Sequence, residues 1–329
     1  IYTIQEGDSN APDYKAEFGD NFEVQEIIRT VLVEEMLPLT LAGNVLNAVG
    51  GTSRLLDPQY VPEYPTQLPM SSRKFWIHLD HFSQEQIDTF IAIEFPTPAG
   101  DPKAKLNEYK TIGQLYNGII KLLEALVKTL GADKVFIKDH SRQIAPEHYY
   151  NSGGEIIKVT DLKSAKEAIE LIIEQGEGTE DNIWEMTNNQ KPVRELSHYY
   201  KFVEIKEGRR YLPSQTDPNE MPMGAPLDVR WDKIFPMKRD VKTADYPDNE
   251  AGKALAASSH HFDMGYRTLL EHLQMAFTGQ QEKMRDAIMI MFKMKYAAID
   301  LMRTPFPGEE GVNAGPGFQF LDKKGKVTA

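Results

Sequence analysis

A glutamate and a histidine spaced three residues apart, Glu195 and His198, are the side chains of this sequence best suited to metal chemistry. On a helix of about 3.6 residues per turn they share a stripe with Phe202 and Ile205, which are apolar and should face a core. Burying a carboxylate and an imidazole without partners is costly, so we expect them to meet water, other polar groups or a metal ion. A Glu-x-x-His pair that projects into a helical bundle is half of a dinuclear carboxylate metal site.

A second carboxylate, Glu35, lies in a helix that the apolar pattern predicts over residues 22–47. The stripe that contains it is made of Ile28, Leu32, Glu35, Leu39 and Ala42. Glu35 is therefore expected to point inward. Pro38 cannot donate a hydrogen bond to the Glu34 carbonyl and crowds it, which costs on the order of 3 kcal/mol in a helix interior. The helix should kink or break there, or two helices should meet.

Apolar residues at helical spacing predict the other elements that position these side chains. The expected helices cover residues 83–93, 111–130, 161–175, 192–205, 250–277 and 280–303. Short strands could form over residues 74–79 and 156–159, and the proline-rich stretch 208–249 should be irregular. Because no internal repeat or linker interrupts them, these elements predict a single, mainly α-helical domain over residues 1–329.

Composition narrows the functions that the chain could have. Its 329 residues carry 37 Lys and Arg against 49 Asp and Glu, a net charge of −12, which argues against a nucleic-acid or anionic-membrane partner. Cysteine is absent, which excludes disulfides, iron–sulfur clusters and thiol catalysis. The sequence begins Ile1-Tyr2-Thr3 without a charged and apolar leader, so we expect no signal peptide in it and a cytoplasmic location, with a homo-oligomer as one option.

Six short blocks of sequence resemble one known family when they are taken in order. They are 34–37 with 44–51, Tyr64-Pro65-x-x-Leu68-Pro69, Ile93-Glu94-x-Pro96, 111–116, 175–178 and 197–202. Together they resemble the ferritin-like domain of the iminophenyl-pyruvate dimer synthases. That family includes the enzymes that join two indole-pyruvate imines in the violacein and rebeccamycin pathways. The resemblance implies a ferritin-like helical bundle, here with long irregular loops and two additional C-terminal helices.

The resemblance also implies a set of metal ligands. One carboxylate comes from a first helix, a Glu-x-x-His from the second, a carboxylate from the third and a Glu-x-x-His from the fourth. The fourth helix retains Glu195 and His198, and the second retains Glu35 but has Pro38 in place of histidine. The third helix has Gln114 where an acid is expected.

The remaining ligands are less well defined by the resemblance. Glu177 is a candidate fourth ligand. The first helix would lie upstream of residue 1, with Ile1 to Ile4 as its last turn. A dinuclear site needs about six ligating side chains to hold two cations. The sequence therefore favours one divalent cation held by Glu35, Glu195 and His198 over a dinuclear iron pair.

Aromatic and histidine pairs give two further hypotheses. Tyr199 and Tyr200 could line a pocket for a flat aromatic, indole-type and perhaps coloured ligand, although core packing explains them equally well. His78 and His81 could bind a metal, but a structural role in the loop before a capped helix is favoured.

These observations predict a ferritin-like protein, non-catalytic or weakly catalytic, that binds a metal ion and an aromatic small molecule. The alternative is a metal-dependent oxidative enzyme that couples two aromatic imino acids, and a purely structural ferritin-like protein is a third option.

Overall fold

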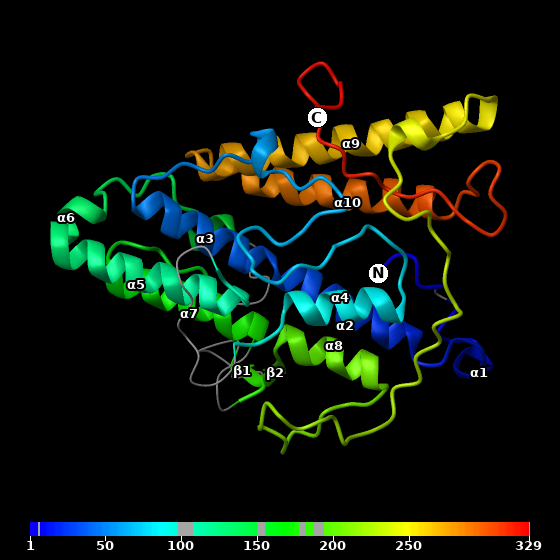
Figure 1. Ribbon diagram of the computed structural model, residues 1–329, viewed down its shortest axis with the longest axis horizontal. Coiled ribbons are helices and arrows are strands. Elements are labelled where there is room, and N and C mark those ends of the chain that lie inside the picture. The colour runs from blue at the N-terminus through cyan, green and yellow to red at the C-terminus, as the bar shows by residue number, and fades with distance from the viewer. Residues whose placement is uncertain (6, 98–107, 150–154, 178–181, 187–193, 329) are drawn as a thin grey trace.

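The computed structural model describes residues 1–5, 7–97, 108–149, 155–177, 182–186 and 194–328, and it is mainly helical (Figure 1). A short helix α1 (Tyr14–Phe18) leads into a long helix that is interrupted once, between α2 (Asn21–Glu34) and α3 (Met36–Ala48). The interruption falls at Glu35, three residues before Pro38, where the missing proline N–H leaves the Glu34 carbonyl without its helical partner. The break expected near Pro38 is therefore present.

The halves of this broken helix belong to two different groups of helices. The first half, α2, packs with α4 (Gln84–Ile93) and α8 (His198–Glu207). The second half, α3, packs with α5 (Ile112–Leu130) and α7 (Leu162–Glu177). Each group has its own apolar core, so the bundle consists of two three-helix parts (Figure 1). The chain passes from one part to the other at Glu35, between α2 and α3.

Two long C-terminal helices, α9 (Glu250–Phe277) and α10 (Lys283–Met302), lie along each other at one side of the bundle (Figure 1). Their bounds confirm the sequence expectation to within three residues, because both carry a regular apolar stripe. Phe262, Met294 and Leu301 form a separate core between them. Short turns of helix complete the fold: η1 (Pro58–Tyr60), α6 (Ala132–Val135), η2 (Pro146–His148) and η3 (Thr243–Asp245).

None of the helices in the described part of the chain combines the length and apolar character that a membrane crossing requires.

Three sequence expectations about local structure are wrong. Ile1 to Ile4 is not the last turn of a helix: Ile4 forms a β-bridge with Ile234, and the Phe235 N–H donates to the Thr3 carbonyl at 2.7 Å. Residues 74–79 and 156–159 form no strands, although Ile77 forms an isolated bridge with Thr66. The strands that do form, β1 (Trp184–Met186) and β2 (Arg194–Leu196), pair antiparallel with Glu195 opposite Glu185.

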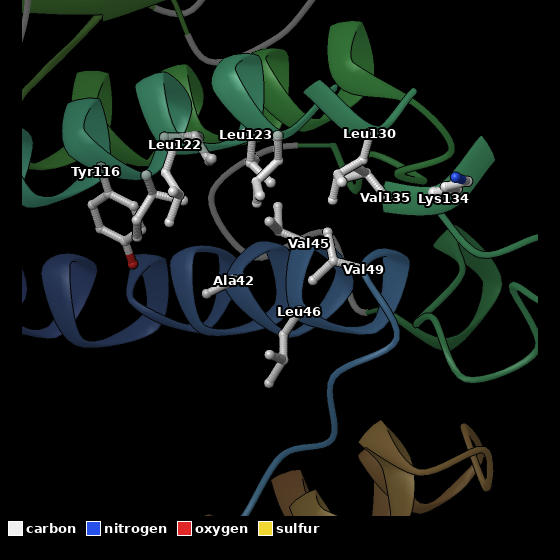
Figure 2. Close-up of a pocket in the computed structure, with 13 residues that line it drawn as sticks. Ala42, Val45, Leu46, Val49, Tyr116, Leu122, Leu123, Leu130, Lys134 and Val135 are labelled. Carbon is white, nitrogen blue, oxygen red and sulfur yellow. The ribbon is translucent and has the colours of Figure 1, made fainter. Parts of the chain in front are cut away.

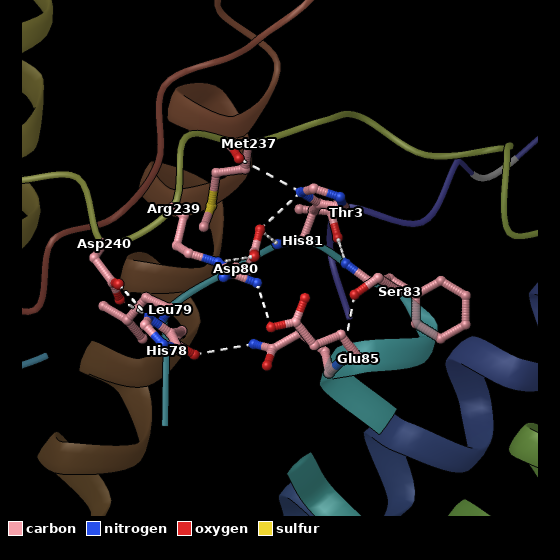
Figure 3. Close-up of polar contacts among 12 residues, drawn as sticks. Thr3, His78, Leu79, Asp80, His81, Ser83, Glu85, Met237, Arg239 and Asp240 are labelled. Carbon is pink, nitrogen blue, oxygen red and sulfur yellow. Dashed lines mark hydrogen bonds and ion pairs between the residues drawn. The ribbon is translucent and has the colours of Figure 1, made fainter. Parts of the chain in front are cut away.

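The loop before α4 is held in place by contacts between its histidines and carboxylates (Figure 3). His78 Nδ1 contacts Asp240, and His81 Nδ1 lies 2.8 Å from Asp80 Oδ1. Arg239 joins Asp80 to Glu85 on the first turn of α4. Burial would raise the pKa of Asp80, but hydrogen bonds from His81 and Arg239 hold it at about 2. These contacts give the histidines the structural role that the sequence favoured.

Candidate metal centre

The candidate metal centre lies where the ends of several helices converge. Glu35 occupies the break between α2 and α3, Glu94 follows the last residue of α4, and His198 is the first residue of α8. One ligand atom from each of these three side chains lies within 4.8 Å of the other two. The group thus combines two carboxylate oxygens with one imidazole nitrogen, a donor set that divalent cations of the first transition row accept.

His198 is oriented by a buried carboxylate on the opposite side of its ring. The side chain is 1% exposed, and its Nε2 lies 3.1 Å from Glu34 Oε2, at hydrogen-bond distance. Its Nδ1 lies 2.9 Å from Glu35 Oε1, but no group in the described part of the chain is aligned to hydrogen-bond with it. Once the imidazole is neutral, a proton held on Nε2 by Glu34 leaves the Nδ1 lone pair directed at Glu35 and Glu94. Carboxylates orient metal-binding histidines in this way.

Glu34 is in turn held by two groups from the neighbouring segment. Lys201 Nζ lies 2.6 Å from Glu34 Oε2, and Glu195 shares a hydrogen bond with the same carboxyl group. Burial would raise the pKa of Glu34, but the hydrogen bonds with His198 and Glu195 and the charge of Lys201 lower it to about 2. Burial and the nearby Glu34 raise the pKa of Glu195 to about 7. At neutral pH, the two carboxyl groups therefore carry a single proton for part of the time.

Without a cation, both ring nitrogens of His198 are protonated at neutral pH. Burial alone would lower its pKa, but the hydrogen bond with Glu34 and the nearby carboxylate of Glu35 raise it to about 10. A cation that binds Nδ1 must displace this proton, so binding is linked to pH.

The donor set fits a single cation after a small contraction. Bonds from such a cation to nitrogen and oxygen ligands are about 2.0–2.2 Å, which places neighbouring donor atoms about 3 Å apart. The present spread of up to 4.8 Å would have to shrink. Glu35 can move because its side chain is 46% exposed.

Comparison with known proteins decides the family. A sequence model described as ferritin-like matches residues 1–207, which is more than half of the chain. The chain belongs to the ferritin-like family. A crystal structure of a ferritin-like protein from Caulobacter vibrioides has a similar fold, with a TM-score of 0.51 and 17% identity over 89% of this chain and 87% of that chain. No curated protein matches the chain significantly. The ferritin-like fold is thus confirmed, whereas the relation to the dimer synthases stays a prediction.

One residue of this ferritin-like site was placed on the wrong element by the sequence pattern. Glu195 was expected on the same helix as His198, but α8 begins only at His198 and Glu195 lies in strand β2. The helix cannot extend back because Ser197 is extended, with φ −63° and ψ 156°, and its N–H donates to the Ile183 carbonyl. Glu195 is not one of the three grouped ligands but lies beside them, where its Oε2 is 3.9 Å from Lys201 Nζ.

The expected inward direction of Glu35 is also corrected. Glu34, 3% exposed, is the buried carboxylate, and Glu35 is partly exposed at the break in the helix. Both touch His198, from opposite sides of the imidazole. The set of helix positions that point inward differs before and after the break, because α2 and α3 pack in different cores.

The other residues expected at the site lie as follows. Gln114, 2% exposed, accepts a hydrogen bond from the Lys110 N–H at the start of α5, which is a helix-end contact. Glu177 ends α7, and its side chain lies outside the described residues.

Tyr199 and Tyr200 belong to an aromatic cluster with Phe95 and Tyr211, and their rings meet edge to face. Packing accounts for this cluster, and binding of a ligand there stays a prediction.

The sequence reasoning did not identify three residues of this candidate site: Glu34, Glu94 and Lys201. Glu94 stands in the block Ile93-Glu94-x-Pro96, directly after a predicted helix end, where a carboxylate could have been considered. Lys201 follows His198 by three residues and shares its helix face, so the same spacing that marked Glu195 could have marked it.

Gly176 provides a direct test of the position of Glu94. A Cβ atom at Gly176 in α7 would come within 2.9 Å of Glu94 Oε2. Replacing Gly176 by alanine favours the helix by up to about 1 kcal/mol but pushes the carboxylate away. We expect Gly176→Ala to keep or raise the melting temperature while lowering Co²⁺ affinity about tenfold, as measured by titration. Unchanged affinity would mean that Glu94 does not bind the cation.

Proposed function

We propose that this ferritin-like protein binds one divalent cation through Glu35, Glu94 and His198, beside a groove that takes a flat, apolar small molecule. The observation that carries the cation site is the buried Nδ1 of His198, directed at two carboxylates and without an aligned hydrogen bond among the described residues. A bound cation would supply Lewis acidity, and Glu34 would keep the imidazole in place.

The small-molecule part of the proposal rests on a groove between α3 and α5 (Figure 2). Its volume is about 490 Å³, within the range of ligand sites, and its walls are aliphatic side chains such as Val45, Leu123 and Leu126. Tyr116 stands at one end and Lys134 at the other (Figure 2). Burial and the charge of Glu35 raise the pKa of Tyr116, so that end of the groove lies near the cation site. Neither Tyr199 nor Tyr200 lines the groove.

Elemental analysis of the protein as isolated tests the cation site. We expect about one first-row metal ion per chain, and Glu35→Gln should lower the occupancy after dialysis at least tenfold because the amide brings no charge. Glu207→Gln, an exposed change elsewhere on α8, is the matched control and should keep the metal. Metal-free protein that also fails to take up Co²⁺, Mn²⁺ or Zn²⁺ would refute this function.

The groove has its own test. Denaturing the purified protein should release an aromatic compound that absorbs near-ultraviolet or visible light, and Ala42→Phe, which narrows the groove, should reduce the amount recovered. If nothing is released and indole shows no calorimetric binding, the small-molecule part of the proposal is wrong while the cation site stands.

The alternative function, oxidative coupling of two aromatic imino acids, is favoured by one observation. The carboxyl group of Glu195 has a pKa of about 7, which suits proton transfer at neutral pH. Coupled product formed from indole-pyruvate imine with an added two-electron oxidant such as peroxide, and lost in Glu195→Ala, would favour the enzyme. Product formation that survives this change would exclude Glu195 as the proton-transfer group.

A further inference from the structure

Lys201 is a buried cation at the centre of the carboxylate cluster. It is 8% exposed, on the first turns of α8, and its Nζ lies 2.6 Å from Glu34 Oε2 and 3.9 Å from Glu195 Oε2. A buried ammonium is rare and is retained only where opposite charges surround it. Here it stands between two carboxyl groups that come from different segments, the end of α2 and strand β2.

Two carboxyl groups that face each other across a few ångströms are also what a second metal ion would bind. We propose that the Lys201 ammonium takes the place of a second cation and limits the site to one divalent ion. The inference rests on the proposed cation site at Glu35, Glu94 and His198, and it concerns the neighbouring position between Glu34 and Glu195.

Space supports this assignment. A cation bound to Glu34 would lie about 2.0–2.2 Å from the carboxylate oxygen. Nζ already lies 2.6 Å from that oxygen, on the side where Glu195 is found. The ammonium and a second ion would therefore compete for the same volume, and their like charges would repel each other strongly in a buried site.

Charge leads to the same conclusion. The groups that face the cluster are the carboxyl groups of Glu34, Glu35, Glu94 and Glu195, the imidazole of His198 and the ammonium of Lys201. Four carboxylates are largely neutralised by one divalent ion together with one ammonium. With the ammonium removed, the carboxyl groups of Glu34 and Glu195 would lack a counter-charge, and a second divalent ion could supply it.

Counting bound Co²⁺ tests the inference on the full chain. Wild-type protein should bind one Co²⁺ per chain in equilibrium dialysis, and Lys201→Ala should bind two. Lys201→Gln, which keeps a side chain that can donate a hydrogen bond to Glu34, is the second variant if the alanine protein does not fold, and it should also bind two. Lys206→Ala, an exposed lysine on α8, is the matched control and should bind one.

The double variant Lys201→Ala/Glu195→Gln checks where the second ion lies. It should return to one Co²⁺ per chain, because the new position has lost one of its two carboxylates. A count of one in both Lys201 variants would overturn the role of Lys201 and leave the proposed cation site intact. A count of zero in the wild type would refute the cation site itself, and a count of two would show that the ammonium does not exclude a second ion.

Discussion

Replacing His198 by glutamine is expected to weaken Co²⁺ binding by about 100-fold or more. Losing only a supporting partner of a metal-binding histidine costs about 10- to 100-fold, and His198 supplies the one nitrogen of the candidate donor set. Equilibrium dialysis or a titration followed by Co²⁺ absorbance measures the change. The substitution keeps a polar side chain of similar size at a position that is 1% exposed, which limits the damage to packing.

Two comparisons separate a lost ligand from a damaged fold. His261→Gln changes an exposed histidine on α9 and should leave affinity unchanged. Glu34→Gln keeps the ligands but loses the carboxylate that orients the imidazole, so it should weaken binding about 10- to 100-fold. The His198 variant should also unfold about 1–3 kcal/mol more easily, because Glu34 loses a buried hydrogen-bond partner. Retained Co²⁺ affinity in His198→Gln would remove the basis of the site.

Elements with a long regular pattern were predictable from the sequence. The α9 helix extends over 28 residues with an apolar stripe and an Asn249 cap, and its expected bounds of 250–277 match the structure. The break at Glu35 was equally predictable, since proline removes a specific hydrogen bond wherever the helix lies. Local rules of this kind require no knowledge of what packs nearby.

The site was less predictable because its geometry depends on distant partners. Arg194, Glu195 and Leu196 fit a helical pattern as well as a strand, and the pairing with Trp184 to Met186 that decides between them lies outside the segment. Glu34 and Glu35 are neighbours in the chain at the end of α2, and only the packing of α2 against α8 decides which is buried. Glu94 joins His198 across 104 residues of chain, a contact that no local spacing predicts.

Cation affinity is expected to rise steeply with pH, about tenfold per unit from pH 6 to pH 8. The contacts with Glu34 and Glu35 raise the pKa of His198 from 6.5 to about 10 against the effect of burial, so the imidazole is protonated throughout this interval. Each bound cation then displaces one proton. Titrations with Co²⁺ at pH 6, 7 and 8 should give about a 100-fold total change, and His198→Gln should lose this slope.

The stability of the metal-free protein should change with pH in the opposite direction. The pKa of His198 is higher in the folded protein, about 10, than its ordinary value of 6.5. Protonated His198 therefore stabilises the fold fully below pH 6.5, and this stabilisation is lost as the pH rises through 10. Its size is on the order of 5 kcal/mol. The pKa of Glu195 is raised from 4.5 to about 7. The folded protein therefore also loses stability as the pH rises from 4.5 to 7.

Urea unfolding from pH 6 to pH 9, with and without saturating Co²⁺, distinguishes the two forms. The metal-free protein should become less stable as the pH rises. The cation-bound protein should become progressively more stable relative to it, because binding strengthens over the same range. If the two curves run parallel, the cation does not displace a proton from His198, and the Nδ1 atom is not its ligand.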